Sequence, residues 1–194
     1  MRIGVLALQG AFAEHIAILR RLKVEALPIR LPRELIGLDG LIIPGGESTS
    51  INRLMLNYNL MSKIRKLGKN GLPIFGTCAG MILLAREVSD SDVEPIGVMD
   101  IVVRRNAFGR QKDSFETELL IPVLGKKPFP GVFIRAPVIE QVNGKVEILA
   151  KLDDGTIVAA RQGKLLASAF HPELTNDLRF HQYFLSLVGG KQHV

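Results

Sequence analysis

The stretch PIFGTCAGMILLA, residues 73–85, decides which fold we expect, because it changes from strand to helix within a few residues. Residues 73–75 have the pattern of a buried strand end, and residues 81–85 that of an apolar helix face. The small residues around Cys78 allow a sharp, strained turn with the thiol at its apex, the cysteine counterpart of a G-x-S-x-G elbow. A helix beginning here would stabilise a thiolate. The alternative is a buried cysteine that packs as a small hydrophobe.

The rest of the first half alternates strand and helix in the same way. Residues 3–8 and 41–43 form apolar strands, and residues 24–27 form a short strand that Pro28 ends. Helical spacing covers residues 12–22, 51–55 and 60–67, and Ser48 or Thr49 is expected to cap the second of these helices. Repeated strand–helix units predict a doubly wound, mainly parallel sheet with right-handed crossovers.

The second half has a different pattern, with short strand-like segments separated by turn signals such as Asp153-Asp154-Gly155. We expect these segments, including "FETELLIPV" and "GVFIRAPVIEQV", to form an antiparallel extension of the same sheet. A last helix is predicted over residues 176–188. Because neither a repeat nor a linker interrupts the sequence, we predict an α/β protein with a single domain over residues 1–194.

Composition narrows the cellular setting and the partners. With 47% hydrophobic and 23% charged residues, the 194-residue chain is globular rather than disordered. A single cysteine excludes an intramolecular disulfide and suits the cytoplasm. No apolar run reaches transmembrane length, so no membrane association is expected. The net charge of +6 comes from dispersed basic residues without interleaved aromatic residues, which favours an acidic protein partner over nucleic acid.

A cysteine nucleophile needs a base, and His171 is the best candidate. It follows the strand-like "KLLASAF", at a strand end where doubly wound sheets bind ligands. Glu173 lies two residues further on, and in an extended segment both side chains would project to one side, so the carboxylate would orient the imidazole toward Cys78. The alternative is a surface loop with an incidental ion pair. His15 and His181 fall within predicted helices, where we expect them to be solvated or packed.

Hydrolysis through a thiol also needs donors for an oxyanion. The Ala79 amide is one, and the turn "IIPGGES", residues 42–48, offers another where Gly45 and Gly46 let the backbone approach a substrate. This turn lacks the lysine of a phosphate-binding loop, and Arg86 is too far along the chain for a cysteine phosphatase motif. Without a His/Cys cluster we expect neither metal nor cofactor. The chemistry indicated is thiol hydrolysis of an acyl or amide bond.

With elbow, glycine turn and H-P-E together, the chain resembles the class I (triad) glutamine amidotransferases. Further stretches are similar to the glutaminase subunits of pyridoxal phosphate synthases: "ALQGAFAEH" (7–15), "PGGEST" (44–49), "RNAFGRQ" (105–111) and "FIRAP" (133–137). These motifs follow one another in order along the whole chain.

The resemblance implies hydrolysis of L-glutamine to glutamate and ammonia, with Cys78 as nucleophile and His171 and Glu173 completing the triad. It also implies that ammonia passes to a synthase subunit, which combines it with a pentose phosphate and a triose phosphate to form pyridoxal phosphate. By the same analogy, the amides of Gly46 and Ala79 form the oxyanion hole. The glycine turn is a natural place for the partner to control hydrolysis.

The resemblance further implies a set of glutamine-binding residues: Gly46, Glu47, Ser48, Arg105, Ile134 and Arg135. A guanidinium fork suits the α-carboxylate of the substrate.

Other interpretations stay open at this stage. The triad is equally compatible with a glutaminase subunit of another ammonia-using synthase, such as imidazole glycerol phosphate synthase. A redox or regulatory elbow-cysteine protein would need Cys78 but not Glu173, and a non-catalytic glutamine sensor would tolerate loss of Cys78 or His171.

Overall fold

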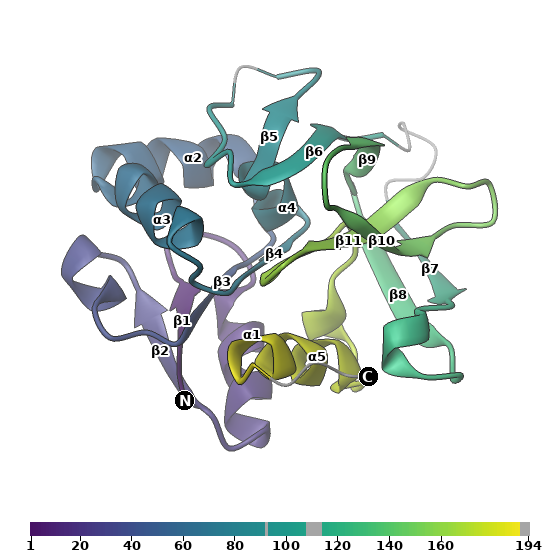
Figure 1. The fold of residues 1–194 in the computed structure, drawn as a ribbon, viewed down its shortest axis with the longest axis horizontal. Helices are drawn as coiled ribbons and strands as arrows, with labels where there is room; N and C mark the ends of the chain where they lie inside the picture. Colours follow the sequence, from purple (N-terminus) through teal and green to yellow (C-terminus); the bar gives the residue numbers. More distant parts are fainter. Residues whose placement is uncertain (92, 108–113, 191–194) are drawn as a thin grey trace.

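The computed structural model describes residues 1–91, 93–107 and 114–190, and it shows a large sheet with helices on both faces (Figure 1). The strands are β1 (Arg2–Leu6), β2 (Glu25–Ile29), β3 (Gly40–Ile43), β4 (Ile74–Thr77), β5 (Ala85–Val88), β6 (Met99–Arg104), β7 (Ser114–Leu119), β8 (Phe129–Ile134), β9 (Val138–Val142), β10 (Glu147–Lys151), β11 (Ile157–Gln162) and β12 (Leu165–Ser168). The helices are α1 (Phe12–Arg21), α2 (Ser48–Asn57), α3 (Leu60–Lys69), α4 (Ala79–Leu84) and α5 (Arg179–Val188), with short 3₁₀ turns η1 (Pro32–Leu35), η3 (Pro122–Leu124) and η4 (Pro172–Leu174). Within the described ranges, no helix has the length and apolar character needed to cross a membrane.

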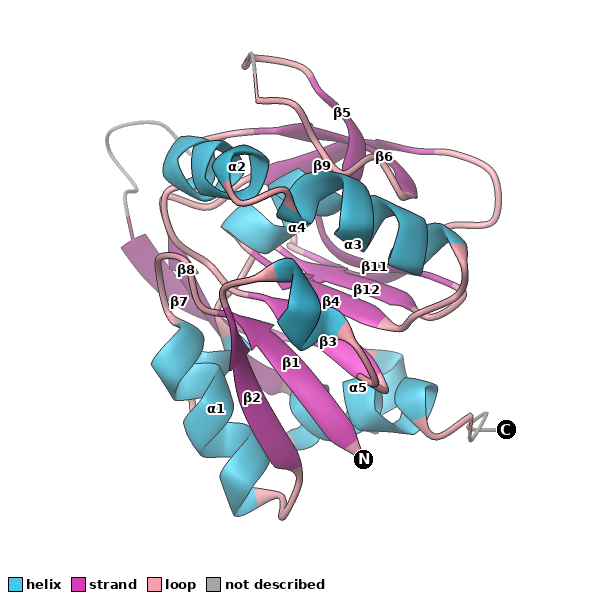
Figure 2. Cartoon of the chain, turned by 90° about the vertical axis from the view of Figure 1, so that its left-hand side faces the viewer, coloured by secondary structure: helices cyan, strands magenta, loops and turns pink. Residues whose placement is uncertain are grey.

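The parallel half of the sheet has the strand order β2-β1-β3-β4-β12. Its inner strands β3, β4 and β12 are buried along their whole length, as expected where helices cover both faces. Helices α1 and α5 lie on one face, and α2, α3 and α4 lie on the other (Figure 2). The predicted doubly wound, mainly parallel α/β architecture is confirmed.

The antiparallel half continues from β12 through β11, β9 and β6, and β10 pairs with β11. One part of the prediction was wrong: β7 and β8 do not join this sheet but pair with each other in a second, two-stranded sheet. The segment "GVFIRAPVIEQV" is split into β8 and β9, because Arg135 has a left-handed φ of 43° and Pro137 has no amide hydrogen. The break redirects the chain from one sheet to the other.

Strand β2 runs through Pro28 rather than ending before it, because Pro28 pairs with Val5 in the parallel register with β1. A proline removes one donor from a strand, which an edge position tolerates. Since β2 pairs only with β1 among the described strands, it is such an edge.

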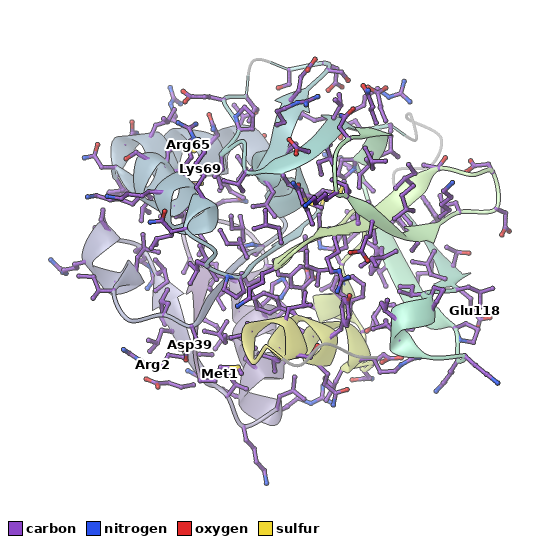
Figure 3. The ribbon with its side chains drawn as sticks, in the orientation of Figure 1. Met1, Arg2, Asp39, Arg65, Lys69 and Glu118 are labelled. Atoms are coloured by element: carbon purple, nitrogen blue, oxygen red, sulfur yellow. The ribbon has the colours of Figure 1, made fainter. Side chains whose placement is uncertain are left out.

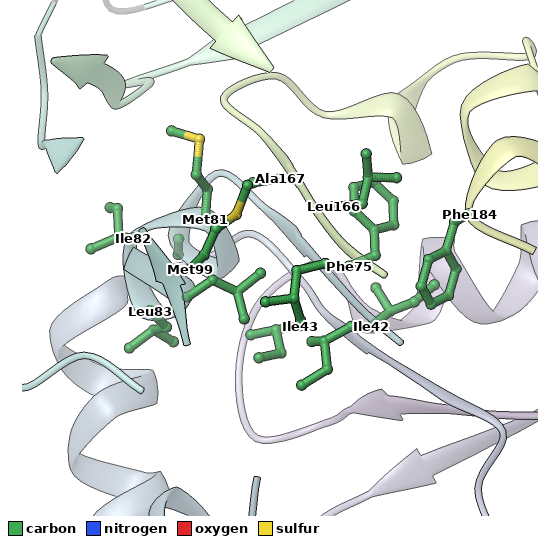
Figure 4. Close-up of a cluster of buried hydrophobic side chains, with 14 of the residues drawn as sticks. Ile42, Ile43, Phe75, Met81, Ile82, Leu83, Met99, Leu166, Ala167 and Phe184 are labelled. Carbon is green, nitrogen blue, oxygen red and sulfur yellow. The ribbon is translucent and has the colours of Figure 1, made fainter. Parts of the chain in front are cut away.

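The core lies between the sheet and its helices. Phe75 of β4 packs on Phe184 of α5, with ring centroids 5.6 Å apart, while Met81 of α4 lies near Met99 of β6 (Figure 4). All four side chains are fully buried, and each such side chain contributes about 1.5–3 kcal/mol. The cluster of buried residues includes both halves of the large sheet, so the two halves share one core.

Charged side chains are spread around the molecule. Asp39 accepts a hydrogen bond from the Arg2 amide at 2.7 Å and holds the start of β1, whereas Arg65 and Lys69 lie on α3 and Glu118 on β7 (Figure 3). The Arg65 guanidinium donates to the Ile96 carbonyl at 2.7 Å, so it fastens a loop to α3. Asp39 and Arg65 therefore stabilise separate edges of the fold.

Candidate active site

Cys78 stands at the junction of β4 and α4 with φ 49° and ψ −103°, a conformation that non-glycine residues rarely adopt. The flanking glycines allow it. A Cβ on Gly80 would lie 2.0 Å from the Ile43 carbonyl oxygen, and one on Gly76 would lie 2.5 Å from the Gly80 carbonyl. The Cys78 amide donates to the Ser168 carbonyl at 2.8 Å, which fixes the turn to β12. The strained strand-to-helix turn predicted from the sequence is confirmed.

His171 follows β12, and its amide donates to the Val132 carbonyl of β8 at 2.8 Å. Its ring Nδ1 lies 2.6 Å from Glu173 Oε1, and both side chains are buried. The expected extended segment was wrong: Pro172 begins the 3₁₀ turn η4, since proline is well suited to the first position of a helical turn. The turn brings Glu173 back onto His171.

The other edge of the imidazole faces Cys78. Burial lowers the pKa of His171, but hydrogen bonds with Cys78 and Glu173 outweigh burial and raise this pKa to about 10. Burial raises the pKa of Glu173, yet the neighbouring His15 and His171 bring its net pKa below the ordinary value. The arrangement therefore favours a protonated imidazole between the sulfur and a carboxylate.

The glycine turn lies directly beside this pair. A Cβ on Gly45 would lie 2.3 Å from His171 Cε1 and 3.3 Å from Cys78 Cβ, so only glycine fits. The Gly45 carbonyl accepts a hydrogen bond from the Ala11 amide at 3.0 Å. In a trans peptide the N–H points opposite to the carbonyl, so the Gly46 N–H points away from Ala11.

The helix α2 begins differently from the prediction. Glu47, rather than Ser48 or Thr49, is its N-cap: the Glu47 carboxylate accepts from the Thr49 amide at 2.9 Å and the Ser50 amide at 2.7 Å. The Ser50 hydroxyl also donates to it, and together with these amides lowers the pKa of Glu47 to about 2. Ser48 is buried at the first helical position.

Some of the predicted glutamine-binding residues lie close together at this end of the sheet. Arg105, just after β6, donates to Ser91 Oγ at 2.7 Å and lies 3.8 Å from Glu47 Oε1. The Ile134 carbonyl, at the end of β8, lies 3.9 Å from Cys78 Sγ. Arg135 is exposed and adjacent. Of "RNAFGRQ", residues 108–111 lie outside the described residues.

Sequence reasoning missed the surroundings of Glu173. His15 of α1 and His181 of α5 are both fully buried, and His15 Nε2 lies 3.4 Å from Glu173 Oε2. One signal was present: His15 follows Phe12 by three residues and precedes Leu19 by four, so it shares the apolar face of its helix.

Known proteins match this chain along nearly its whole length. The model of the SNO glutamine amidotransferase family matches residues 5–189. A pyridoxal 5'-phosphate synthase subunit PdxT from Herpetosiphon aurantiacus is 60% identical, covering 96% of this chain and 100% of the relative. A PdxT subunit from Moorella thermoacetica is 59% identical, covering 97% and 100%.

Solved structures agree with these relatives. A glutamine amidotransferase crystal structure has a TM-score of 0.92 at 49% identity, covering 97% of this chain and 100% of that one. A GMP synthase protein from Thermoplasma acidophilum has a TM-score of 0.72 at 17% identity, covering 98% of this chain and 94% of that one, and shares the fold.

The chain belongs to the SNO glutamine amidotransferase family. The resemblance to glutaminase subunits of pyridoxal phosphate synthases is confirmed by relatives that carry the name PdxT.

Proposed function

We propose that Cys78, His171 and Glu173 carry out the glutaminase reaction of this chain. The chain hydrolyses L-glutamine to glutamate and ammonia, and the ammonia serves pyridoxal 5'-phosphate synthesis. The observation that supports these roles is the arrangement of the three residues. Cys78, on a strained backbone turn, faces the imidazole of His171, and Nδ1 of this ring is 2.6 Å from the buried carboxylate of Glu173.

In the first step, the Cys78 thiolate, whose proton has passed to His171, attacks the side-chain carbonyl carbon of glutamine. The C–N bond then breaks, and His171 gives its proton to the leaving nitrogen, which departs as ammonia. A glutamyl thioester remains on Cys78. Glu173 accepts the hydrogen bond from Nδ1 throughout, so Nε2 is the nitrogen that exchanges protons with the substrate.

In the second step, water attacks the thioester. Once the sulfur is acylated it no longer stabilises the imidazolium, so the pKa of His171 falls from its raised value. Neutral His171 then takes a proton from the water, and the C–S bond breaks to release glutamate. The same interaction that keeps His171 protonated before acylation is thus removed when a base is needed.

Each tetrahedral intermediate carries an oxyanion, which we assign to the amides of Gly46 and Ala79. Ala79 follows the nucleophile at the start of α4. The Gly45–Gly46 peptide packs on Cys78 and His171, and the Ala11 amide holds its carbonyl on the opposite side. Loss of one such donor typically costs about 10²–10³ in kcat.

The amino-acid end of glutamine is assigned to a group of residues around the same opening: Gly46, Glu47, Ser48, Arg105, Ile134 and Arg135. The contact between Arg105 and the Glu47 turn supports this assignment, because it places a cation beside the glycine turn. A guanidinium pairs well with a carboxylate.

The protein partner we propose is the synthase subunit of a pyridoxal 5'-phosphate synthase, which would take up the ammonia in the cytoplasm. Relatives described as subunits of that enzyme support this partner. They also favour it over the imidazole glycerol phosphate synthase alternative.

The test is to label the protein with an electrophilic glutamine analogue and to assay glutaminase activity with the synthase subunit present. Wild-type protein should gain one label, located at Cys78 by mass spectrometry. Cys78→Ala should lose labelling and activity, whereas Ser89→Ala, a change at an exposed hydroxyl, should retain both. Full activity of Cys78→Ala would overturn the assignment.

A further inference from the structure

Two histidines lie beside the carboxylate of the proposed triad. His15 of α1 and His181 of α5 are fully buried, and His15 Nδ1 lies 2.9 Å from His181 Nε2. The glutaminase steps above use neither. Two buried imidazoles in hydrogen-bond contact are costly to desolvate, so their position beside Glu173 requires an explanation.

The surroundings of this pair favour one set of tautomers. His15 Nε2 lies 3.4 Å from Glu173 Oε2 and 3.3 Å from Thr77 Oγ1. If His15 carries its proton on Nε2, this N–H donates to Thr77 Oγ1 and its positive end lies beside the carboxylate, while Nδ1 accepts from His181 Nε2–H. His181 Nδ1, which has no partner among the described residues, is then an unprotonated nitrogen.

The opposite tautomers are disfavoured on two grounds. In them the Thr77 hydroxyl would donate to His15 Nε2, but the lone pair on this nitrogen would lie 3.4 Å from the carboxylate, and His181 would carry a buried N–H on Nδ1 with nothing described to receive it. An unpaired buried donor costs about 1–3 kcal/mol. The direction of the chain is therefore His181 to His15 to Glu173.

Both rings are held in place, and burial disfavours their charged forms. Phe75 contacts the His15 and His181 rings edge to face, with interplanar angles of 87° and 80°. Burial is the largest influence on the pKa of His15 and lowers it. The charge of Glu173 raises this pKa, His171 lowers it and Glu14 raises it, and the net pKa is below the ordinary value. Burial and then His15 place the pKa of His181 well below its usual range.

Glu173 therefore has a partner on each oxygen. Oε1 accepts from His171, and Oε2, which makes no hydrogen bond among the described residues, lies 3.4 Å from His15 Nε2. The 3.4 Å separation is longer than an ordinary hydrogen bond, so the contact acts mainly as a dipole beside a charge. Without His15, Oε2 would lose this contact, and the carboxylate could rotate or take up a proton more easily.

We propose that His15, oriented by His181, is a positioning residue that keeps Glu173 ionised and aligned on His171. The proposal deepens the assigned glutaminase function and rests on it. His15 affects catalysis indirectly, because it contacts neither glutamine nor the Cys78 sulfur. It acts on the rate through the carboxylate that orients the imidazole.

The variants that test this are His15→Phe, which keeps a ring but removes the N–H, and His15→Gln, whose side-chain amide can restore a donor near Nε2. Glutaminase kinetics are measured with the full chain and an excess of the synthase subunit. Loss of an outer hydrogen-bond partner of a metal-ligating side chain typically costs 10- to 100-fold, and we expect a similar decrease in kcat for His15→Phe. KM should change less than about twofold, because glutamine is not contacted. His15→Gln should recover most of the rate.

The pH profile separates positioning from mere packing. The groups that face Glu173 are His15 of α1 and His171 of its own segment. Burial raises the pKa of Glu173 and His15 lowers it, so removal of His15 should raise this pKa. The acidic limb of the kcat profile should move to higher pH in His15→Phe and return in His15→Gln. A folded His15→Phe with wild-type kcat and an unmoved acidic limb would overturn the proposal.

A second measurement does not depend on the variant folding. Nitrogen NMR of histidine-labelled wild-type protein should show His15 and His181 neutral with the proton on Nε2, and His171 protonated on both nitrogens. A proton on His15 Nδ1 would overturn the positioning role. Failure of the underlying function is recognised separately, because Cys78→Ala would then retain activity whatever His15 does.

Discussion

Nδ1 of His171 and Oε1 of Glu173 lie 2.6 Å apart, the distance of a short, charge-assisted hydrogen bond, within a segment closed by a 3₁₀ turn. Two residues so close in sequence hold each other by local geometry alone. The remaining member of the proposed triad, Cys78, arrives from another strand, so its alignment depends on how β4 and β12 pair.

Replacing the carboxylate by an amide tests the orienting role. Glu173→Gln keeps the size but can present its N–H₂ to Nδ1, which would favour the wrong imidazole tautomer. The corresponding Asp-to-Asn exchange in a serine protease triad lowers kcat about 10⁴-fold, and we expect a large fall here with the synthase subunit present. Steady-state kinetics measure it, with circular dichroism to verify the fold. An unchanged kcat would remove Glu173 from the triad.

The charge state of His171 gives a pH prediction. Its pKa rises from 6.5 in the unfolded chain to about 10 in the folded protein. A group whose pKa is higher in the folded protein than in the unfolded chain stabilises the fold. This stabilisation is complete below the unfolded-state pKa and is lost as the pH rises to the folded-state pKa. NMR titration should find His171 still protonated at pH 8. The stability advantage of wild type over His171→Asn, from urea unfolding, should shrink between pH 6.5 and about 10. Titration of His171 near 6.5 would contradict the prediction.

The elbow glycines give a prediction on stability. In Gly80→Ala the new Cβ would lie 2.0 Å from the Ile43 carbonyl oxygen, so β3 or α4 has to move. Overpacking of this kind typically costs about 1–3 kcal/mol, and backbone atoms yield least. Gly189→Ala is the matched control, because its nearest neighbour is 3.6 Å away and its φ is −73°. Equal unfolding free energies for the two variants would show that the elbow has room.

Much of this architecture could be predicted from local sequence patterns. The elbow at Cys78 and the His171–Glu173 pair each depend on a few consecutive residues, so residue type and spacing predicted both contacts, although a 3₁₀ turn and not an extended segment forms the pair. The separate β7–β8 sheet could not be predicted, since pairing partners are a tertiary choice and only the turn at Arg135 redirects the chain. The His15–His181 contact joins residues 166 positions apart, beyond the reach of any local pattern.

The glutamine-binding assignment predicts a change in KM. Arg105→Ala removes a guanidinium 3.8 Å from the Glu47 carboxylate and should mainly raise KM for glutamine, if it supplies binding that is equal in ground and transition states. Arg104→Ala is the control, since Arg104 is exposed and paired with Glu140. Wild-type KM in Arg105→Ala would place this arginine outside the substrate site. Arg135→Ala is expected to behave like Arg105→Ala.

The last prediction concerns control by the partner. A free glutaminase would release ammonia uselessly, so a gate in the oxyanion hole is chemically desirable. Reversing the Gly45–Gly46 peptide would break the hydrogen bond between the Ala11 amide and the Gly45 carbonyl, and would put a carbonyl where the Gly46 N–H is needed. The chain alone already has the orientation with the Ala11 bond in this structure, and docking of the synthase subunit should stabilise it against the reversed orientation. Turnover should then rise by about 10²–10³, the effect of one oxyanion donor.

Gly10 offers a direct way to disturb this gate. A Cβ on Gly10, which has φ 95°, would lie 1.9 Å from the Gly45 carbonyl oxygen, so Gly10→Ala should drive that carbonyl out of its place beside Ala11. We expect Gly10→Ala to stay slow even with saturating partner, while Cys78 still reacts with a small alkylating agent. Partner binding is checked by co-sedimentation, and the fold by thermal unfolding. If the variant binds the partner and is activated like wild type, the orientation of this peptide does not control hydrolysis. If docking changes only the KM of wild type, docking shapes the glutamine site instead.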